Sequence, residues 1–361
     1  MSKNLFVLIL LLFVILGCDL FLPDDKEDKE IIKHPSEYTW TVDTINVSSV
    51  SWFDPMGFYY RNEKDIRIHG YQGIYREVVL RYNGEQWQVE KWTTPAWYIS
   101  DVTEIEGTPY AIGAKMHPPI ENSESFGSQP MILKYEENEW KDIFYANADT
   151  QTRSYLFDIW GDSENNIWTG GWDGMLYHFD GSKWEDYTLP DSIWITNFSG
   201  KNSSELYATA YYYLGGIESG YILKWADSSW IIDNHFKDIH SDYEKRPFGN
   251  MDMYVGDKYM FSCGRGVYIK PKEQTEWEKS DEAKWTLFFD MDGSSDNNVY
   301  AVGFSSVMVY WDGENFIDCW NLWDAEKIPY CVFQKVWTDG RQVYIVGRAY
   351  DYSKIYVIHG E

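Results

Sequence analysis

The sequence predicts an all-β protein, a seven-bladed β-propeller with four-stranded antiparallel blades, closed by an N-terminal strand that completes the last blade. Three observations predict it. Aromatic residues make up 18% of the 361 residues, and rings suit half-buried strands. A strand pattern recurs about every 46 residues, the period of a propeller blade. Finally, one unpartnered strand copy stands near the N-terminus.

The repeat is clearest in residues 158–184 and 293–316. Each segment contains an inner strand, an Asn-rich turn, a second strand that ends in glycine, a loop, and a hairpin around Asp180-Gly181 or Asp312-Gly313. Asp-Gly is favoured there because two-residue hairpin turns require positive φ. We therefore expect four antiparallel strands in each copy.

Seven second strands are recognisable, at 66–70, 110–113, 167–171, 207–210, 259–261, 299–303 and 344–347. A tryptophan follows the hairpin turn in five copies, at Trp87, Trp140, Trp184, Trp230 and Trp277. These rings obey the repeat, so we interpret them as structural.

The two ends of the repeat complement each other. The last copy stops at residues 355–361, before its fourth strand, and an orphan strand occupies residues 38–45. Pairing of these segments closes the ring and removes two exposed sheet edges. Residues 38–361 are therefore predicted to form one propeller.

The N-terminus has the pattern of an export signal. Lys3 precedes an apolar run from Leu5 to Leu16, which is short for a membrane span. Residues 15–18, Ile-Leu-Gly-Cys, resemble the lipobox of bacterial lipoproteins. The resemblance implies a signal peptide over 1–17, lipidation of Cys18 and an acidic tether over 18–37. The alternative is an ordinary signal peptide or signal anchor with an incidental cysteine.

The same resemblance implies a lipid-anchored protein of the bacterial cell envelope. Acidic residues after Cys18 resemble the export signal of surface lipoproteins in Bacteroidetes-type bacteria, whereas Asp19 resembles an inner-membrane retention signal. We expect the outer membrane or the cell surface rather than the inner membrane.

Charge and cysteine usage exclude several classes. The net charge of −26 makes nucleic acid a poor partner. The odd set of Cys263, Cys319 and Cys331 is predicted to be three free thiols, because Cys319 and Cys331 fall on an outer strand and on the inner strand of the next blade. No phosphate loop, dinucleotide fingerprint or nucleophile elbow is present, and no cofactor or metal is predicted.

The third and sixth copies also resemble a family. Their run Gly-Ser-x-x-Asn-x-Val-Tyr-Ala-Val-Gly, followed by Asp-Gly-x-x-Trp, is similar to propeller repeats of bacterial exported proteins, including kelch-like and two-component-regulator types. The resemblance implies the fold and no single activity.

In a propeller, the loops between second and third strands share one face with the loops between blades. The residues beyond each closing glycine are the predicted ligand-binding set: Tyr75, Arg76, Trp172, Asp173, Tyr211, Tyr212, Tyr213, Arg265, Arg348 and Tyr350. Such rings stack on sugars or bind peptides, and arginines bind carboxylates. For each residue the alternative is packing between blades.

Three longer segments complete the analysis. Residues 115–130 and 211–220 are predicted to be long loops, and 235–246 a charged connector between the fourth and fifth blades. His and Asp residues within 235–244 could ligate a metal if that segment folded back, but we favour the connector.

The predicted function is a lipid-anchored, extracytoplasmic module that binds a protein, peptide or glycan through this loop face. The alternative is a carbohydrate-active hydrolase or lyase with carboxylates at the tunnel mouth. It requires two carboxylates about 5 to 10 Å apart in a pocket, one with a raised pKa. No catalytic residue is assigned.

The lipid anchor makes a direct prediction. Cys18→Ser removes the thiol that would carry the acyl chains, so the protein should move from the membrane fraction to the soluble fraction. Fractionation with immunoblotting measures this. Unchanged membrane retention would contradict lipidation at Cys18.

Overall fold

The computed structural model describes residues 32–47, 53–72, 76–91, 97–117, 127–137, 139–146, 154–189, 193–215, 217–239, 245–282, 286–321 and 329–361. The compact body runs from Lys33 to Glu361. The predicted signal, Cys18 and most of the acidic tether lie outside the described residues. Within the described part, no helix is long and apolar enough to cross a bilayer.

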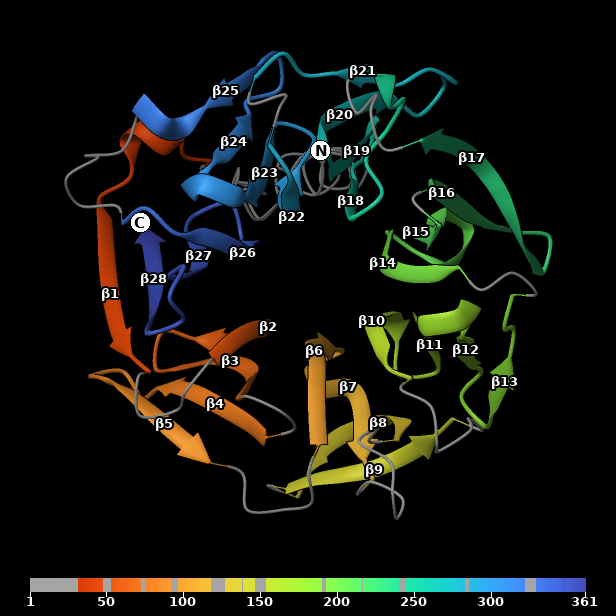
Figure 1. Cartoon of the computed structure of the whole chain (residues 1–361), viewed down its shortest axis with the longest axis horizontal. Helices are drawn as coiled ribbons and strands as arrows, with labels where there is room; N and C mark the ends of the chain where they lie inside the picture. Colours follow the sequence, from red (N-terminus) through yellow and green to blue (C-terminus); the bar gives the residue numbers. More distant parts are fainter. Residues whose placement is uncertain are drawn as a thin grey trace, which may run out of the picture. The chain divides into compact units, whose positions relative to one another are not determined.

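Seven four-stranded antiparallel sheets are arranged in a ring, as predicted (Figure 1). In blades 1 to 6 the strands follow the chain from the inside to the outside of the ring. Blade 1 contains β2 (Phe53–Asn62), β3 (Asp65–Gln72), β4 (Arg76–Tyr82) and β5 (Trp87–Lys91). Blade 2 contains β6 (Trp97–Ile105), β7 (Thr108–Met116), β8 (Ser128–Glu136) and β9 (Glu139–Tyr145). Blade 3 contains β10 (Leu156–Ser163), β11 (Asn166–Gly171), β12 (Leu176–Phe179) and β13 (Trp184–Asp186).

Blade 4 contains β14 (Trp194–Gly200), β15 (Leu206–Leu214), β16 (Ile217–Ala226) and β17 (Ser229–Ile239). Blade 5 contains β18 (Asp252–Val255), β19 (Tyr259–Gly264), β20 (Gly266–Pro271) and β21 (Glu278–Lys279). Blade 6 contains β22 (Phe288–Ser295), β23 (Asn298–Gly303), β24 (Met308–Trp311) and β25 (Phe316–Asp318). Blade 7 contains β26 (Val332–Thr338), β27 (Val343–Arg348), β28 (Lys354–Gly360) and β1 (Trp40–Asn46). The helical turns η1 (Pro35–Glu37), η2 (Trp172–Gly174), η3 (Ser203–Glu205), η5 (Phe304–Ser306) and η6 (Cys319–Asn321) have three residues each.

The predicted closure is confirmed. β1 pairs with β28 in an unbroken antiparallel register from Trp40 opposite Gly360 to Asn46 opposite Lys354. The N–H of Thr39 adds a hydrogen bond of 2.9 Å to the carbonyl of Glu361. The start of the chain therefore supplies the outer strand of the blade that the end of the chain builds.

The hydrophobic cores lie between neighbouring blades. One of them combines Ile105 and Ile112 of blade 2 with Leu156 and Ile167 of blade 3. All five hairpin tryptophans predicted to be structural pack against such cores: Trp87, Trp140, Trp184, Trp230 and Trp277. The aromatic excess thus fills the gaps between blades.

The Asp-Gly turns differ from the two-residue form that we predicted. β24 ends at Trp311 and pairs with Phe316, so the loop between them has four residues. Gly313 keeps the positive φ, 101°. The carboxylate of Asp312 accepts N–H bonds from Glu314 and Asn315 at 2.8 and 2.7 Å. This side-chain cap stabilises the longer loop.

The three cysteines of the propeller, Cys263, Cys319 and Cys331, are free and buried, as predicted. Cys319 follows the outer strand of blade 6, and Cys331 precedes the inner strand of blade 7. Both belong to the core between these blades.

Two loop predictions are wrong. Residues 211–220 are not an insertion, because β15 and β16 continue through them and pair as far as Leu214 opposite Ile217. The connector predicted at 235–246 is strand up to Ile239, since β17 extends to match the long β16. The third segment, 115–130, begins in β7 and ends in β8. Its residues 118–126 lie outside the described residues.

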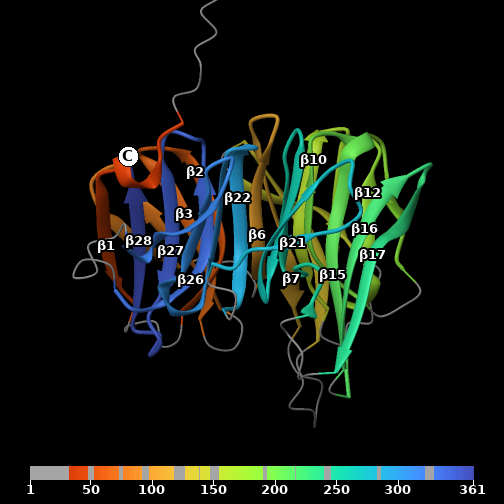
Figure 2. The same cartoon turned by 90° about the horizontal axis from the view of Figure 1, so that it is seen from above.

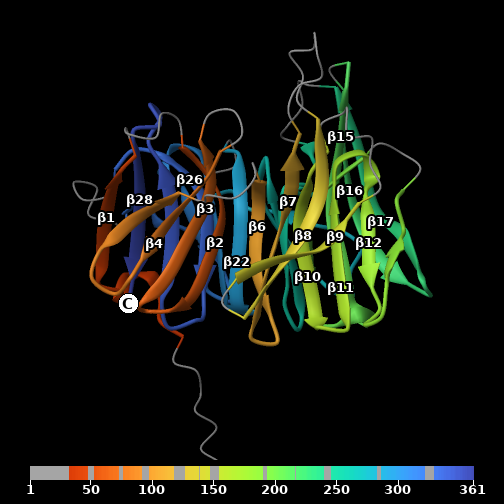
Figure 3. The same ribbon diagram turned by 90° about the horizontal axis from the view of Figure 1, so that it is seen from below.

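The strands run roughly along the axis of the ring (Figures 2 and 3). Each blade therefore places its loop between second and third strands on the same face as the connection to the next blade. We call this the loop face. The inner strands enter the ring from it.

The closure predicts a stability effect. Ile45 of β1 is buried with 7% exposure in the core between blades 7 and 1. Ile45→Ala should lower the free energy of unfolding by about 2 to 4 kcal/mol, measured by denaturant titration. Exposed Thr44 of the same strand is the control, and Thr44→Ala should cost less than about 1 kcal/mol. Equal small losses would mean that β1 contributes little to closure.

Candidate functional site

The inner strands share an irregularity near their loop-face ends. Six of them contain a β-bulge, which inserts one unpaired residue into the strand. The bulge residues are Met56, Ser100, Phe157, Thr196, Phe289 and Gln334. In blade 5, Met251 occupies the corresponding position just before β18. Bulges redirect side chains and recur beside functional sites.

These seven residues surround one cavity. Its volume is about 260 Å³, and Met56, Ser100, Phe157, Thr196, Met251, Phe289 and Gln334 all line it, together with Pro55, Tyr211 and Lys335. Six blades thus contribute their bulge residue, and blade 5 contributes Met251, to the same opening. We call it the mouth cavity, since it lies at the loop-face end of the central channel.

The next residue of each inner strand forms a second layer. This floor ring consists of Gly57, Asp101, Asp158, Asn197, Asp252, Asp290 and Lys335. Its carboxylates hold neighbouring blades together. Asp158 accepts a hydrogen bond from the N–H of Phe198, one blade further on.

The same contact recurs between later blades. Asp252 accepts from the N–H of Met291 at 3.1 Å, and Asp290 from that of Val336 at 2.7 Å. Each carboxylate satisfies a backbone donor on the inner strand of the next blade, the edge strand of its sheet. The aspartates of the floor ring are therefore structural links.

Burial and close contact shift the pKa values of the floor ring. Burial, followed by the charge of Asp101, raises the pKa of Asp158 well above its ordinary value, and the two carboxyl groups are hydrogen-bonded to each other. Burial and Asp290 act in the same way on the pKa of Asp252. Burial alone would lower the pKa of Lys335, but the surrounding carboxylates raise it. Its ammonium group lies 2.8 Å from Asp290.

An arc of aromatic rings borders the mouth cavity from blade 4 to blade 1. Successive ring centroids are 4.5 to 5.8 Å apart along Tyr211, Trp194, Trp172, Tyr155, Tyr98 and Tyr71. Trp172 and Trp194 are stacked, with 14° between their planes. Burial and the nearby Glu218 raise the pKa of Tyr211 to about 12, so its hydroxyl stays neutral.

A second aromatic group lies on blades 6 and 7. Phe304 is the counterpart of Trp172, because both follow the closing glycine and donate their N–H to the chain before the inner strand. Its ring lies 5.0 Å from that of the bulge residue Phe289. Beyond it, Tyr330 and Tyr350 are stacked at 5.3 Å, with 65% and 44% of their surfaces exposed.

The predicted cations are part of the scaffold. Arg348 is buried, and its Nε lies 2.8 Å from Asp54. Its guanidinium also lies 3.8 Å above the ring of Tyr352. Arg265 is half-buried, and its charge helps to lower the pKa of Glu218. Both charges are thus matched by carboxylates of this chain.

The rest of the predicted set is dispersed. Of the ten residues, Tyr211 lines the mouth cavity and Trp172 packs near Phe157 on its border. Asp173 is exposed in a turn with φ 53°, while half-buried Tyr212 and exposed Tyr213 continue along β15. Tyr75 and the side chain of Arg76 lie outside the described residues. Ligand binding by this set stays a prediction.

The bulge residues were missed by the sequence analysis, which searched only loops. A signal exists, because Ser100, Phe157, Met251 and Phe289 each precede an aspartate at the start of an inner strand. A polar residue repeated at one position of an otherwise buried strand indicates a special backbone role.

The carboxylate pairs do not match the enzyme alternative. Asp101 and Asp158 are hydrogen-bonded to each other, as are Asp252 and Asp290, so both pairs are closer than the 5 Å or more of glycosidases. Asp158, Asp252 and Asp290 also accept backbone N–H groups of the next blade. Among the described residues, no group of three or more His, Cys, Asp or Glu side chains could hold a metal ion.

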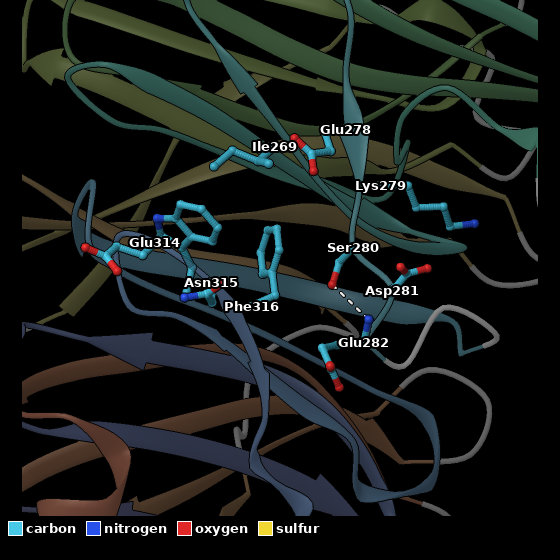
Figure 4. A pocket seen from close by; sticks show the side chains of 10 residues that line it. Ile269, Glu278, Lys279, Ser280, Asp281, Glu282, Glu314, Asn315 and Phe316 are labelled. Carbon is cyan, nitrogen blue, oxygen red and sulfur yellow. Dashed lines mark hydrogen bonds between the residues drawn. The ribbon is translucent and has the colours of Figure 1, made fainter.

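A second cavity, of about 270 Å³, lies between the outer parts of blades 5 and 6 (Figure 4). Glu278, Asp281, Glu282 and Glu314 surround it with the rings of Trp311 and Phe316. It is formed by two blades only, whereas the mouth cavity is formed by all seven. We therefore assign the candidate site to the mouth cavity.

Comparisons with known proteins identify the fold. No protein-family model matches the chain, and no curated protein sequence matches it. YCF48 bound to D1 peptide is similar with a TM-score of 0.58 at 12% identity, over 88% of this chain and 96% of that one. The WD40 domain of Neurospora crassa Pan2 is similar with a TM-score of 0.55 at 11% identity, over 90% and 96%. YCF48 from Cyanidioschyzon merolae has a TM-score of 0.55 at 12% identity, over 87% and 98%.

The links between blades predict a pH dependence. Burial raises the pKa of Asp292 from 3.8 to about 7, although it accepts the N–H of Thr338 at 2.8 Å. The folded state therefore binds this proton more tightly than the unfolded state, and the resulting stability is lost as pH rises from about 4 to about 7. Asp292→Asn should flatten the fall in unfolding free energy over this range, measured by denaturant titration. Asp173→Asn, at an exposed aspartate, is the control and should leave the slope unchanged; equal slopes in both variants would contradict the assignment.

Proposed function

We propose that this protein is a lipid-anchored, extracytoplasmic propeller that binds a protein or peptide segment at the mouth of its central channel. The supporting observation is the mouth cavity with its aromatic border. Rigid rings supply contact area at little entropic cost, and they carry much of the binding energy at protein interfaces.

The size of the mouth cavity favours a peptide over a glycan or a small molecule. Its 260 Å³ is below the roughly 300 to 1,000 Å³ of ordinary ligand pockets. A single side chain fits this volume, while the flanking chain lies across the aromatic arc from Tyr211 to Tyr71. A sugar chain would contact the border and leave the cavity empty.

A similar structure supports the same class of ligand. YCF48, a propeller that aligns over most of this chain, is bound to the D1 peptide. The identity of 12% transfers no residue roles to this chain. We take from it only that a ring of this architecture accommodates a peptide.

The location follows from the N-terminal sequence. The lipobox-like residues 15–18 support acylation of Cys18, and the acidic segment after it is a tether to the membrane. We propose the outer membrane or the cell surface as the site of anchoring. The strongly acidic propeller would then bind its partner outside the cytoplasm.

The proposal is tested by removing one ring of the arc. Peptides are selected from a phage-displayed library on the full-length protein in detergent, and their affinities are measured by calorimetry. Trp172→Ala should weaken binding by at least about tenfold, as expected for a central aromatic contact. Trp320→Ala removes a tryptophan that is 47% exposed in η6, outside the arc, and should leave affinity unchanged.

Two outcomes would contradict the proposal. One is equal affinity of the Trp172→Ala and Trp320→Ala variants. The other is a glycan-array signal that depends on Trp172 together with no selected peptide, which would identify a glycan-binding face instead.

A further inference from the structure

We infer that the mouth cavity receives a basic side chain, lysine or arginine, from the bound segment. This inference rests on the proposed function, and it names the chemistry of the residue that enters the channel. It follows from three independent features: the hydrogen-bond acceptors of the cavity, the carboxyl groups in the floor ring beneath it, and its aromatic rings.

The first feature is an unsatisfied acceptor. Gln334 lines the cavity, and its Nε2 donates to Asp54 at 2.8 Å. Because an ionised carboxylate only accepts hydrogen bonds, this contact fixes which end of the amide is nitrogen. The Oε1 atom is then buried without a hydrogen-bond partner among the described residues. A donor from the ligand would satisfy it.

Three donor groups of the lining are already used. Ser100 donates to the carbonyl of Ile112 at 3.2 Å, and Thr196 to that of Asn250 at 3.1 Å. The ammonium of Lys335 pairs with Asp290. In the floor ring, Oδ1 of Asn197 is another buried acceptor without a partner in the described part of the chain. Both unsatisfied groups are therefore hydrogen-bond acceptors, and a ligand would have to supply the donors.

The second feature is charge. The floor ring has four carboxyl groups from blades 2, 3, 5 and 6 and one ammonium group, from Lys335 of blade 7; blades 1 and 4 contribute uncharged Gly57 and Asn197. Asp290 pairs with Lys335 at 2.8 Å, and Asp101 and Asp158 are hydrogen-bonded to each other. Carboxyl groups therefore outnumber the single cation beneath the cavity, within a chain of net charge −26. This field attracts a cation and repels a carboxylate.

The third feature is a pair of rings. Phe157 of blade 3 and Phe289 of blade 6 both line the cavity. Around the propeller, blades 4 and 5 lie between blades 3 and 6 in one direction, and blades 7, 1 and 2 lie between them in the other. The strands β10 and β22 therefore lie on different sides of the channel (Figure 1). Trp172 and Phe304 pack near them. Aromatic faces attract ammonium and guanidinium groups through the cation–π interaction. A neutral polar side chain does not gain this attraction.

The experiment uses capped tripeptides, acetyl-Gly-X-Gly-amide, with the full-length protein in detergent at low salt. X is arginine, lysine, citrulline, norleucine or glutamate, and affinities are measured by ligand-observed NMR. Arginine or lysine should bind at least about tenfold more tightly than its uncharged isostere, citrulline or norleucine. Added salt should weaken only the basic peptides.

Two variants test the assigned atoms. Gln334→Met removes the acceptor at similar size and should reduce binding of the basic peptides by about tenfold. Gln342→Met is the matched control, because Gln342 belongs to the same blade at the opposite end of β26 and β27 and bonds Tyr60. Phe289→Leu keeps an apolar side chain but removes the aromatic ring. It should therefore reduce the ratio between the affinities of the arginine and citrulline peptides. Unfolding midpoints verify that each variant folds.

Several results would overturn the inference. These are equal binding of the basic and uncharged peptides, tighter binding of glutamate, or no binding of any tripeptide at millimolar concentration. If phage-selected peptides lose affinity in Trp172→Ala but contain no basic residue, the inference fails while the proposed function stands. If no peptide of any kind binds, both fail.

Discussion

Ring closure is the constraint on which the rest of the structure depends. Seven blades form a closed ring only if the last blade pairs with the first, and here β1 supplies the outer strand of blade 7 along its whole length. The cores lie between blades, so an unclosed ring would expose both faces of the core between blades 7 and 1. Closure also gives the channel a fixed circumference, because each inner strand has a neighbour on both sides.

That circumference determines the chemistry at the centre. Six of the inner strands bulge at the same level, and blade 5 places Met251 at the corresponding position, so all seven residues line the shared opening. On the free edge of the inner strands, N–H groups are bound by carboxylates of the preceding blade, as for Asp158 with Phe198 and Asp290 with Val336. The mouth cavity and the acidic ring below it are therefore formed by successive residues of the same strands.

The carboxylates of the floor ring differ from the catalytic carboxylates of glycosidases. A catalytic carboxylate needs an oxygen directed at the substrate, whereas the aspartates of the floor ring direct theirs at backbone donors and at each other. The residues left to meet a ligand are the rings around the opening and Gln334. They offer apolar faces and a hydrogen-bond acceptor, which suit recognition.

The sequence by itself determined the number of blades, their four strands, the closing strand and the structural tryptophans, because these features repeat or complement one another along the chain. It also predicted that Trp172 and Tyr211 lie near the channel mouth, since each directly follows a predicted second strand. The predictions from local sequence patterns were wrong at 211–220 and 235–246, because β15, β16 and β17 pair with one another into these segments. Only the tertiary structure decided that Phe157, Phe289 and Gln334 meet at one cavity, and that Arg348 is matched by Asp54. These residues are separated by tens to hundreds of positions, and only the closed ring brings them within reach.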